Sequence, residues 1–110
     1  MYITGSGMVC SVGLNAASAC AAMRAGISGF TELPYHDNQG EPIIGALVPG
    51  MPFDLNRTER LVELLSMAIN DCLMDKPAES LERIPLLVAL AEPNRPGGGA
   101  GLTPTIIQQV

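Results

Sequence analysis

Three cysteines and a single histidine are the residues of this chain best suited to nucleophilic chemistry: Cys10, Cys20, Cys72 and His36. Cys20 and Cys72 fall in segments with helical spacing, on or near the apolar side. Neither begins a helix, where the dipole would favour the reactive thiolate. His36 lies in a turn-forming stretch, and one histidine with two distant cysteines is not a zinc-binding pattern. We therefore expect structural thiols, a solvated loop histidine, and no catalytic or metal-ligating residue.

Two pairs of carboxylates also have a spacing that could support acid–base chemistry. Glu59 with Glu63, and Asp71 with Asp75, lie four residues apart, so each pair shares one side of a helix. Arginines are interleaved with these carboxylates, which is typical of a solvated helix face. We predict such a face rather than a proton-transfer site.

Two glycine-rich stretches have the composition of phosphate-binding loops. Residues 97–101 precede a helix start but lack the Lys-Ser/Thr pair of a Walker site. Gly5-Ser6-Gly7 supplies only G-x-G, without the third glycine or the acidic residue of a dinucleotide fingerprint. We predict a loop and a structural turn, with no cofactor-binding residue and no cofactor.

The composition indicates one small folded domain with a sparsely charged surface. Its 110 residues are 47% apolar and 15% charged, whereas an ordinary domain is roughly 25% charged. The six basic residues are scattered and the net charge is −5, which argues against nucleic acid and anionic membranes as partners. Residues 1–23 lack the charged start of a signal peptide, and the odd cysteine count without CxxC indicates free thiols. We predict a cytoplasmic protein that does not enter the membrane.

Strands and helices alternate along the chain, which predicts an α/β fold. Helix 15–25 has Asn15 as N-cap and Gly26 just beyond its end, and helix 56–74 begins with a capping-box pattern. Apolar strand 86–91 should lie at the centre of a parallel sheet, although strand 43–48 could instead pair antiparallel. The full expectation comprises strands 2–9, 43–48 and 86–91, helices 15–25 and 56–74 against the sheet, and turns over 26–42.

Residues 92–110 predict a flexible Pro/Gly loop over 92–102 and a further helix. Thr103 suits the N-cap and Pro104 the first helical position. Such a helix has about two turns before residue 110. This pattern is compatible with a truncated domain and with a natural short protein.

Two motifs near the N-terminus resemble the opening of the β-ketoacyl-acyl-carrier-protein synthases. Residues 2–13, YITGSGMVCSVG, are similar to the family pattern V-x-I-T-G-x-G-x-V-[ST]-x-x-G. Residues 23–30, MRAGISGF, resemble L-x-x-G-x-S-G-I, and the distance between the two motifs is similar as well. The helix entered through Arg57-Thr58-Glu59-Arg60-Leu61 resembles one that starts near Asp-Arg in the family. Residues 91–96 depart from the family's glycine-rich loop, which indicates a divergent branch.

The resemblance implies the N-terminal part of a thiolase-like fold with α-β-α-β-α layers, covering residues 1–110. In that family a cysteine carries an acyl chain that is condensed with malonyl-acyl-carrier protein, and two histidines assist. These positions lie outside residues 1–110, so the resemblance implies a fragment inactive by itself. Acyl carrier protein would be a partner of the full-length enzyme only.

Two other functions are compatible with the same sequence. The first is a non-catalytic thiolase-fold protein that binds or scaffolds a partner chain, and the second is a small interaction domain that retained the motif. We also predict that residues 1–110 do not form a self-sufficient monomer. The charge is sparse, helix 15–25 is rich in alanine, and strand 86–91 needs cover on both faces. A homo-oligomer or a partner chain is therefore expected.

Overall fold

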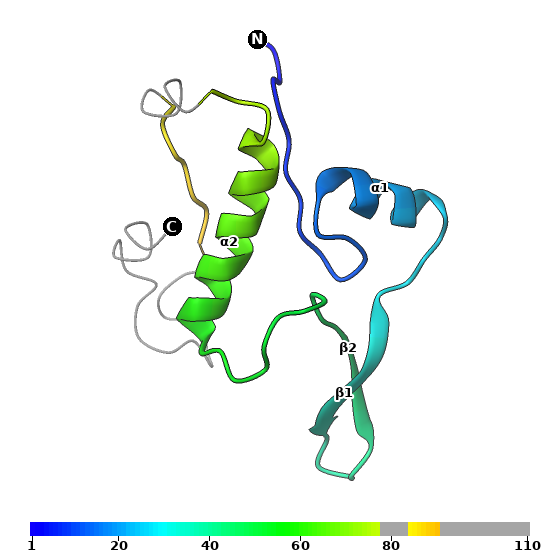
Figure 1. Cartoon of the computed structure of the whole chain (residues 1–110). Helices are drawn as coiled ribbons and strands as arrows, with labels where there is room; N and C mark the ends of the chain where they lie inside the picture. Colours follow the sequence, from blue (N-terminus) through cyan, green and yellow to red (C-terminus); the bar gives the residue numbers. More distant parts are fainter. Residues whose placement is uncertain (78–83, 91–110) are drawn as a thin grey trace.

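Two helices and one two-stranded sheet make up the regular structure of the residues that the computed structural model describes, 1–77 and 84–90 (Figure 1). The fold of this part is mixed α/β, with one antiparallel pair of strands. The elements follow the order α1 (Ala16–Arg24), β1 (Phe30–His36), β2 (Pro42–Ala46) and α2 (Arg57–Leu73). The loop expected over 92–102 and the helix expected from Thr103 lie outside the described residues.

Both helices are the predicted ones, and both begin with a reciprocal capping box. In α1 the Asn15 side chain accepts from the Ser18 backbone N–H at 2.8 Å, and the Ser18 side chain accepts from the Asn15 N–H. In α2 the Asn56 side chain accepts from the Glu59 N–H at 3.0 Å, and the Glu59 carboxylate accepts from the Asn56 N–H at 2.9 Å. Each capping box supplies acceptors for N–H groups at the start of the helix, which have no carbonyl partner within the helix. These local bonds explain why both helix starts could be predicted.

Residues 26–42, expected to be turns, contain strand β1, so that expectation is wrong for Phe30–His36. β1 pairs antiparallel with β2, with Phe30 opposite Ala46 and Glu32 opposite Ile44. The ladder is irregular between Glu32 and His36, the stretch that contains Pro34, whose nitrogen has no hydrogen to donate. Strand β2 lies where strand 43–48 was expected, and its antiparallel pairing was one of the two predicted alternatives.

The other two expected strands do not form in the described residues, and neither does a parallel sheet. Residues 2–9 follow an extended path without a strand partner, and residues 84–90 do the same. Residue 91, the last of the expected central strand, is outside the described part. A strand requires a neighbour for its backbone groups, and in the described chain both segments lie beside α2 instead (Figure 1).

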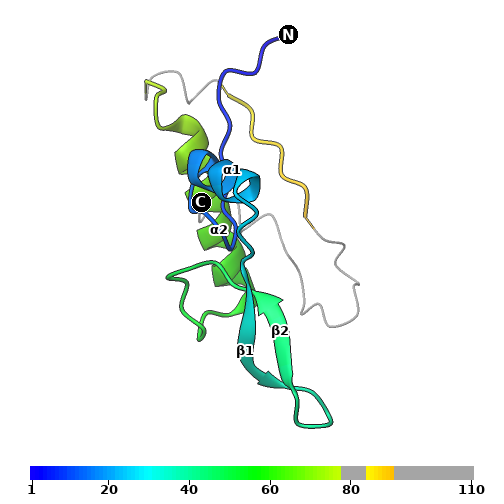
Figure 2. The ribbon, with the colours of Figure 1, turned by 90° about the vertical axis from the view of Figure 1, so that its right-hand side faces the viewer.

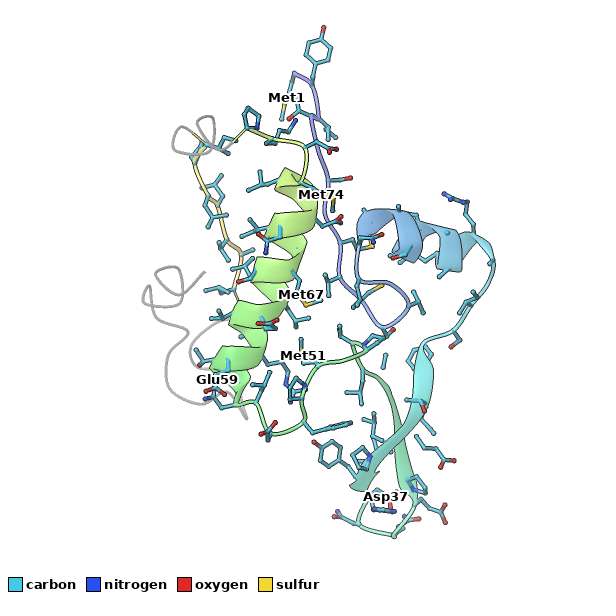
Figure 3. All side chains as sticks on the ribbon, in the orientation of Figure 1. Met1, Asp37, Met51, Glu59, Met67 and Met74 are labelled. Carbon is cyan, nitrogen blue, oxygen red and sulfur yellow. The ribbon has the colours of Figure 1, made fainter. Side chains whose placement is uncertain are left out.

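The packed core of the described residues is very small. Only Ala19 and Ala22, both on α1, are buried, and no residue of α2 is. Large apolar side chains remain exposed, and Leu87 reaches 94% exposure. Figure 2 shows the β1–β2 hairpin projecting away from the two helices, and Figure 3 shows the side chains that line these open surfaces. The described part therefore leaves many large apolar side chains exposed.

Candidate functional site

The N-terminal glycine motif packs directly against the C-terminal half of α2. A Cβ atom added to Gly7 would lie 2.7 Å from the Cys72 nitrogen and would also overlap the Ala68 carbonyl oxygen. One added to Gly5 would lie 2.7 Å from the Cys72 carbonyl oxygen. Real Cβ atoms do not approach backbone so closely, so only glycine allows this contact. Residues 5–7 follow an extended path rather than the expected structural turn, and the two glycines allow that path to approach the helix closely.

Asp71 joins three parts of the chain through one carboxylate oxygen. Its Oδ2 accepts a hydrogen bond from the Met8 N–H at 3.1 Å and another from the Ala16 N–H at 2.7 Å. The Ala16 N–H belongs to the first turn of α1, where an acceptor is needed. The prediction of a solvated face is therefore wrong for Asp71, although Asp75 is exposed as expected. The sequence contains no signal for this role, because only the positions of the Met8 and Ala16 N–H groups distinguish Asp71 from a solvated carboxylate.

Two basic side chains hold backbone carbonyl groups at the two ends of α2. Lys76 Nζ donates to the Thr4 carbonyl oxygen at 2.7 Å, beyond the C-terminus of the helix. Arg60 Nη2 donates to the carbonyl oxygens of the chain that enters α2, at 3.5, 3.2 and 3.4 Å from Pro52, Phe53 and Leu55. Glu59, also expected on a solvated face, caps the same helix. These contacts stabilise the framework around α2.

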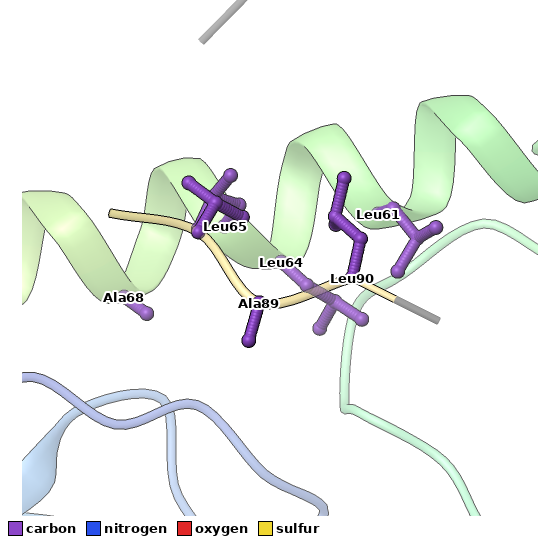
Figure 4. A pocket seen from close by; sticks show the side chains of 7 residues that line it. Leu61, Leu64, Leu65, Ala68, Ala89 and Leu90 are labelled. Atoms are coloured by element: carbon purple, nitrogen blue, oxygen red, sulfur yellow. The ribbon is translucent and has the colours of Figure 1, made fainter. Parts of the chain in front are cut away.

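In the described chain several hollows adjoin α2, and the one in Figure 4 has a strongly apolar lining. It has a volume of about 260 Å³ and separates α2 from the extended segment 84–90. A second, of about 400 Å³, lies beside Asp71 between the start of α1 and α2, and a third, of about 230 Å³, lies beside residues 49–52. The lining of the hollow in Figure 4 consists of aliphatic side chains only: Leu61, Leu64, Leu65, Ala68, Val88, Ala89 and Leu90. Such a lining can cover apolar surface but supplies no nucleophile, acid or base.

The residues first considered for chemistry are not brought together. Cys10 lies in a tight turn closed by its N–H and the Gly13 carbonyl at 2.9 Å, Cys20 lies in α1, and Cys72 lies in α2. All three are half-buried free thiols, and in residues 1–77 and 84–90 none of them makes a side-chain hydrogen bond. His36 is exposed at the end of β1, so it is a strand residue rather than the expected loop residue. Within the described chain no cluster of three potential metal ligands occurs.

Comparison of the chain with known protein families, curated proteins and solved structures finds no match. In the described residues, no helix has the length and apolar character needed to cross a membrane. The glycine run at 97–101 lies outside the described part.

Proposed function

We propose that this chain forms the N-terminal part of a condensing enzyme of the β-ketoacyl-acyl-carrier-protein synthase type, inactive by itself. The observation that carries the proposal is the pair of motifs at residues 2–13 and 23–30, separated by helix α1. The structure supports it through the motif glycines. Gly5 and Gly7 lie where any side chain would overlap α2, and Gly26, with φ of +69°, ends α1 in the left-handed conformation.

The open apolar surfaces support a layered fold of which these residues are one part. No residue of α2 is buried, and Leu86, Leu87 and Leu90 are exposed beside it. In the proposed thiolase-like arrangement, residues 2–9 and 84–90 become strands once neighbouring strands are supplied, and helices cover both faces of the sheet. That cover would come from further polypeptide, a second copy or a partner chain.

In this proposal the described residues have a structural role, and catalysis belongs to the rest of the domain. The described residues contain no paired nucleophile and base, so this part contributes framework, and the catalytic cysteine and two histidines belong to the rest of the domain. The complete enzyme would take its acyl and malonyl groups from acyl carrier protein. The three free thiols suit the reducing cytoplasm, where the proposal locates the protein.

A non-catalytic scaffold of the same fold is the second candidate. The observation that favours it is the aliphatic hollow between α2 and segment 84–90. The uncovered aliphatic hollow beside α2 would then be a surface for a partner chain. Both candidates share the fold and differ only in whether the completed domain is catalytic.

A chimera tests the proposal directly. Residues 1–77 replace the corresponding segment of an active β-ketoacyl-acyl-carrier-protein synthase, and condensation of acyl- and malonyl-carrier protein is followed by mass spectrometry. We expect a folded chimera that condenses. Gly7→Val should abolish its activity because the new side chain overlaps α2, whereas the neighbouring exposed Ser6→Val should retain it.

Three other outcomes are informative. A chimera that fails to fold beside a folded parent contradicts the family proposal. A folded chimera that accepts the acyl group but does not condense favours the scaffold. The isolated 110-residue chain, incubated with the same carriers, should show no acylated cysteine, and stoichiometric acylation of Cys10, Cys20 or Cys72 would contradict the assignment of catalysis to another part of the domain.

A further inference from the structure

The aliphatic hollow between α2 and segment 84–90 presents an open apolar surface (Figure 4). Its volume is about 260 Å³, and every side chain that lines it is a leucine, a valine or an alanine. Leu90, one of these residues, is 40% exposed. Because no lining side chain has a polar atom, a charged occupant would lose its hydration without compensation. The hollow therefore favours an aliphatic occupant without charge.

Of the residues outside the described part, one segment has this chemistry. Residues 102–110, LTPTIIQQV, contain four aliphatic residues and no charged one. The other two stretches, 78–83 and 91–101, each contain charged side chains: Glu79, Glu82, Arg83, Glu92 and Arg95. Segment 102–110 is therefore the best match to the hollow among these stretches.

The spacing of residues in segment 102–110 suits the packing of one helix against another. In the helix predicted from residue 103, Ile106 and Val110 lie four residues apart on one side, and Gln108 lies on the opposite side. A helix of eight residues is about 12 Å long. The wall that α2 contributes to the hollow extends over residues 61–68, which is also eight residues. The two surfaces thus match in length as well as in polarity.

The connection along the chain favours this segment over a separate partner. Leu90 lines the hollow, and only residues 91–101 separate it from Leu102. A chain of eleven residues with four glycines spans about 18 Å on average, which exceeds the length of the wall. An occupant tethered in this way has an effective concentration on the order of millimolar. A second copy or another protein would have to compete with that concentration.

We propose that residues 102–110 dock as a helix in this hollow, with Leu102, Ile106 and Val110 against the aliphatic wall. The docked segment removes apolar surface of α2 and of segment 84–90 from water without burying a charge. The inference rests on the hollow and on the adjoining sequence, and it does not require the proposed function. Docking would also close the surface that the scaffold candidate presents to a partner chain.

Methyl NMR on the complete 110-residue chain tests the docking. We expect nuclear Overhauser effects between the Ile106 methyl groups and those of Leu61, Leu64 and Leu65, at all protein concentrations. In an equal mixture of isotopically labelled and unlabelled chains, these effects should not occur between different chains. Their absence overturns the proposal. Effects found only between chains also overturn it, because they identify a second copy as the occupant.

Two substitutions to asparagine form a matched pair in the same segment. Ile106→Asn places an amide against the aliphatic wall and should lower the hydrogen-exchange protection of residues 106–110 by about tenfold or more. Gln108→Asn introduces the same side chain on the opposite side of the helix and should change this protection by less than about threefold. Protection of the Met8 N–H, which is bonded to Asp71, establishes that the rest of the fold is retained in each variant.

Two results of the exchange experiment contradict the docking. In the first, residues 106–110 of the unsubstituted chain exchange as fast as an unfolded peptide. In the second, Ile106→Asn and Gln108→Asn lower the protection equally, which would mean that the side of the helix carrying Ile106 is not the one that is buried.

Discussion

Two regions of the described chain are stabilised in different ways. The first is formed by the two helices and segment 1–9, and the second is the β1–β2 hairpin. Segment 1–9 and the start of α1 are joined to α2 and to Lys76, just beyond its end, by bonds between residues 55 to 72 positions apart. The hairpin is held by its own ladder and by the Asp37 side chain, which accepts from Gln39 and Glu41 in the turn. The first region therefore depends on the whole described chain, whereas the second depends on neighbours along the sequence. Substitutions in the first should act globally, and those in the second locally.

The largest expected effect is at Gly7, where segment 1–9 meets α2. Gly7→Val should destabilise the protein by about 3 kcal/mol, because its side chain overlaps the backbone at Ala68 and Cys72. Urea unfolding followed by circular dichroism measures the change. Ser6→Val, one residue earlier and exposed, is the control and should change the midpoint little. Equal midpoints for the two variants would show that the close approach does not contribute to stability.

The next effect is at Asp71. Asp71→Ala leaves the Met8 and Ala16 N–H groups without their acceptor and should cost about 2 kcal/mol. Hydrogen exchange at these two amides should accelerate, whereas Asp75→Ala, a matched change at an exposed carboxylate one turn later, should leave both rates unchanged. Unchanged exchange in Asp71→Ala would mean that this carboxylate does not join the three segments.

A smaller effect is expected in the hairpin turn. Gly40 has φ of +85°, and a Cβ there meets no atom within 4 Å, so Gly40→Ala should cost about 1 kcal/mol through backbone strain alone. Hydrogen exchange should accelerate in β1 and β2 and remain unchanged in α2. Loss of protection in α2 as well would contradict the independence of the two regions.

The smallest expected effect is at Lys76. Lys76→Met removes the bond to the Thr4 carbonyl but retains most of the aliphatic stem, and should cost about 0.5 kcal/mol. Exchange at the Met8 N–H, which is bonded to Asp71 in the same segment, should accelerate slightly while the unfolding midpoint is nearly constant. If Lys76→Met lowered the urea midpoint as much as Asp71→Ala does, the bond between Lys76 and Thr4 would be the main attachment of segment 1–9.

Part of the candidate site could be predicted from the sequence, because some properties of a residue depend only on its neighbours along the chain. The expectations of free thiols and an exposed His36 were correct, whereas the turn expected at Gly5-Ser6-Gly7 does not form. The role of Asp71 was missed because Asp71 and Asp75 lie four residues apart whether both carboxylates are solvated or one of them accepts hydrogen bonds from another segment. The spacing alone therefore does not separate the two cases. Only the positions of Met8 and Ala16 distinguish the two.

The sequence by itself determined the two helices, since each capping box joins residues only three positions apart and the spacing of apolar residues follows within the same segment. The tertiary structure alone decided how extended segments are used. Residues 30–36 paired with β2, and residues 2–9 and 84–90 came to lie along α2. A strand is completed by hydrogen bonds to a partner that can be anywhere in the chain or in another chain, so its local sequence cannot specify its neighbour.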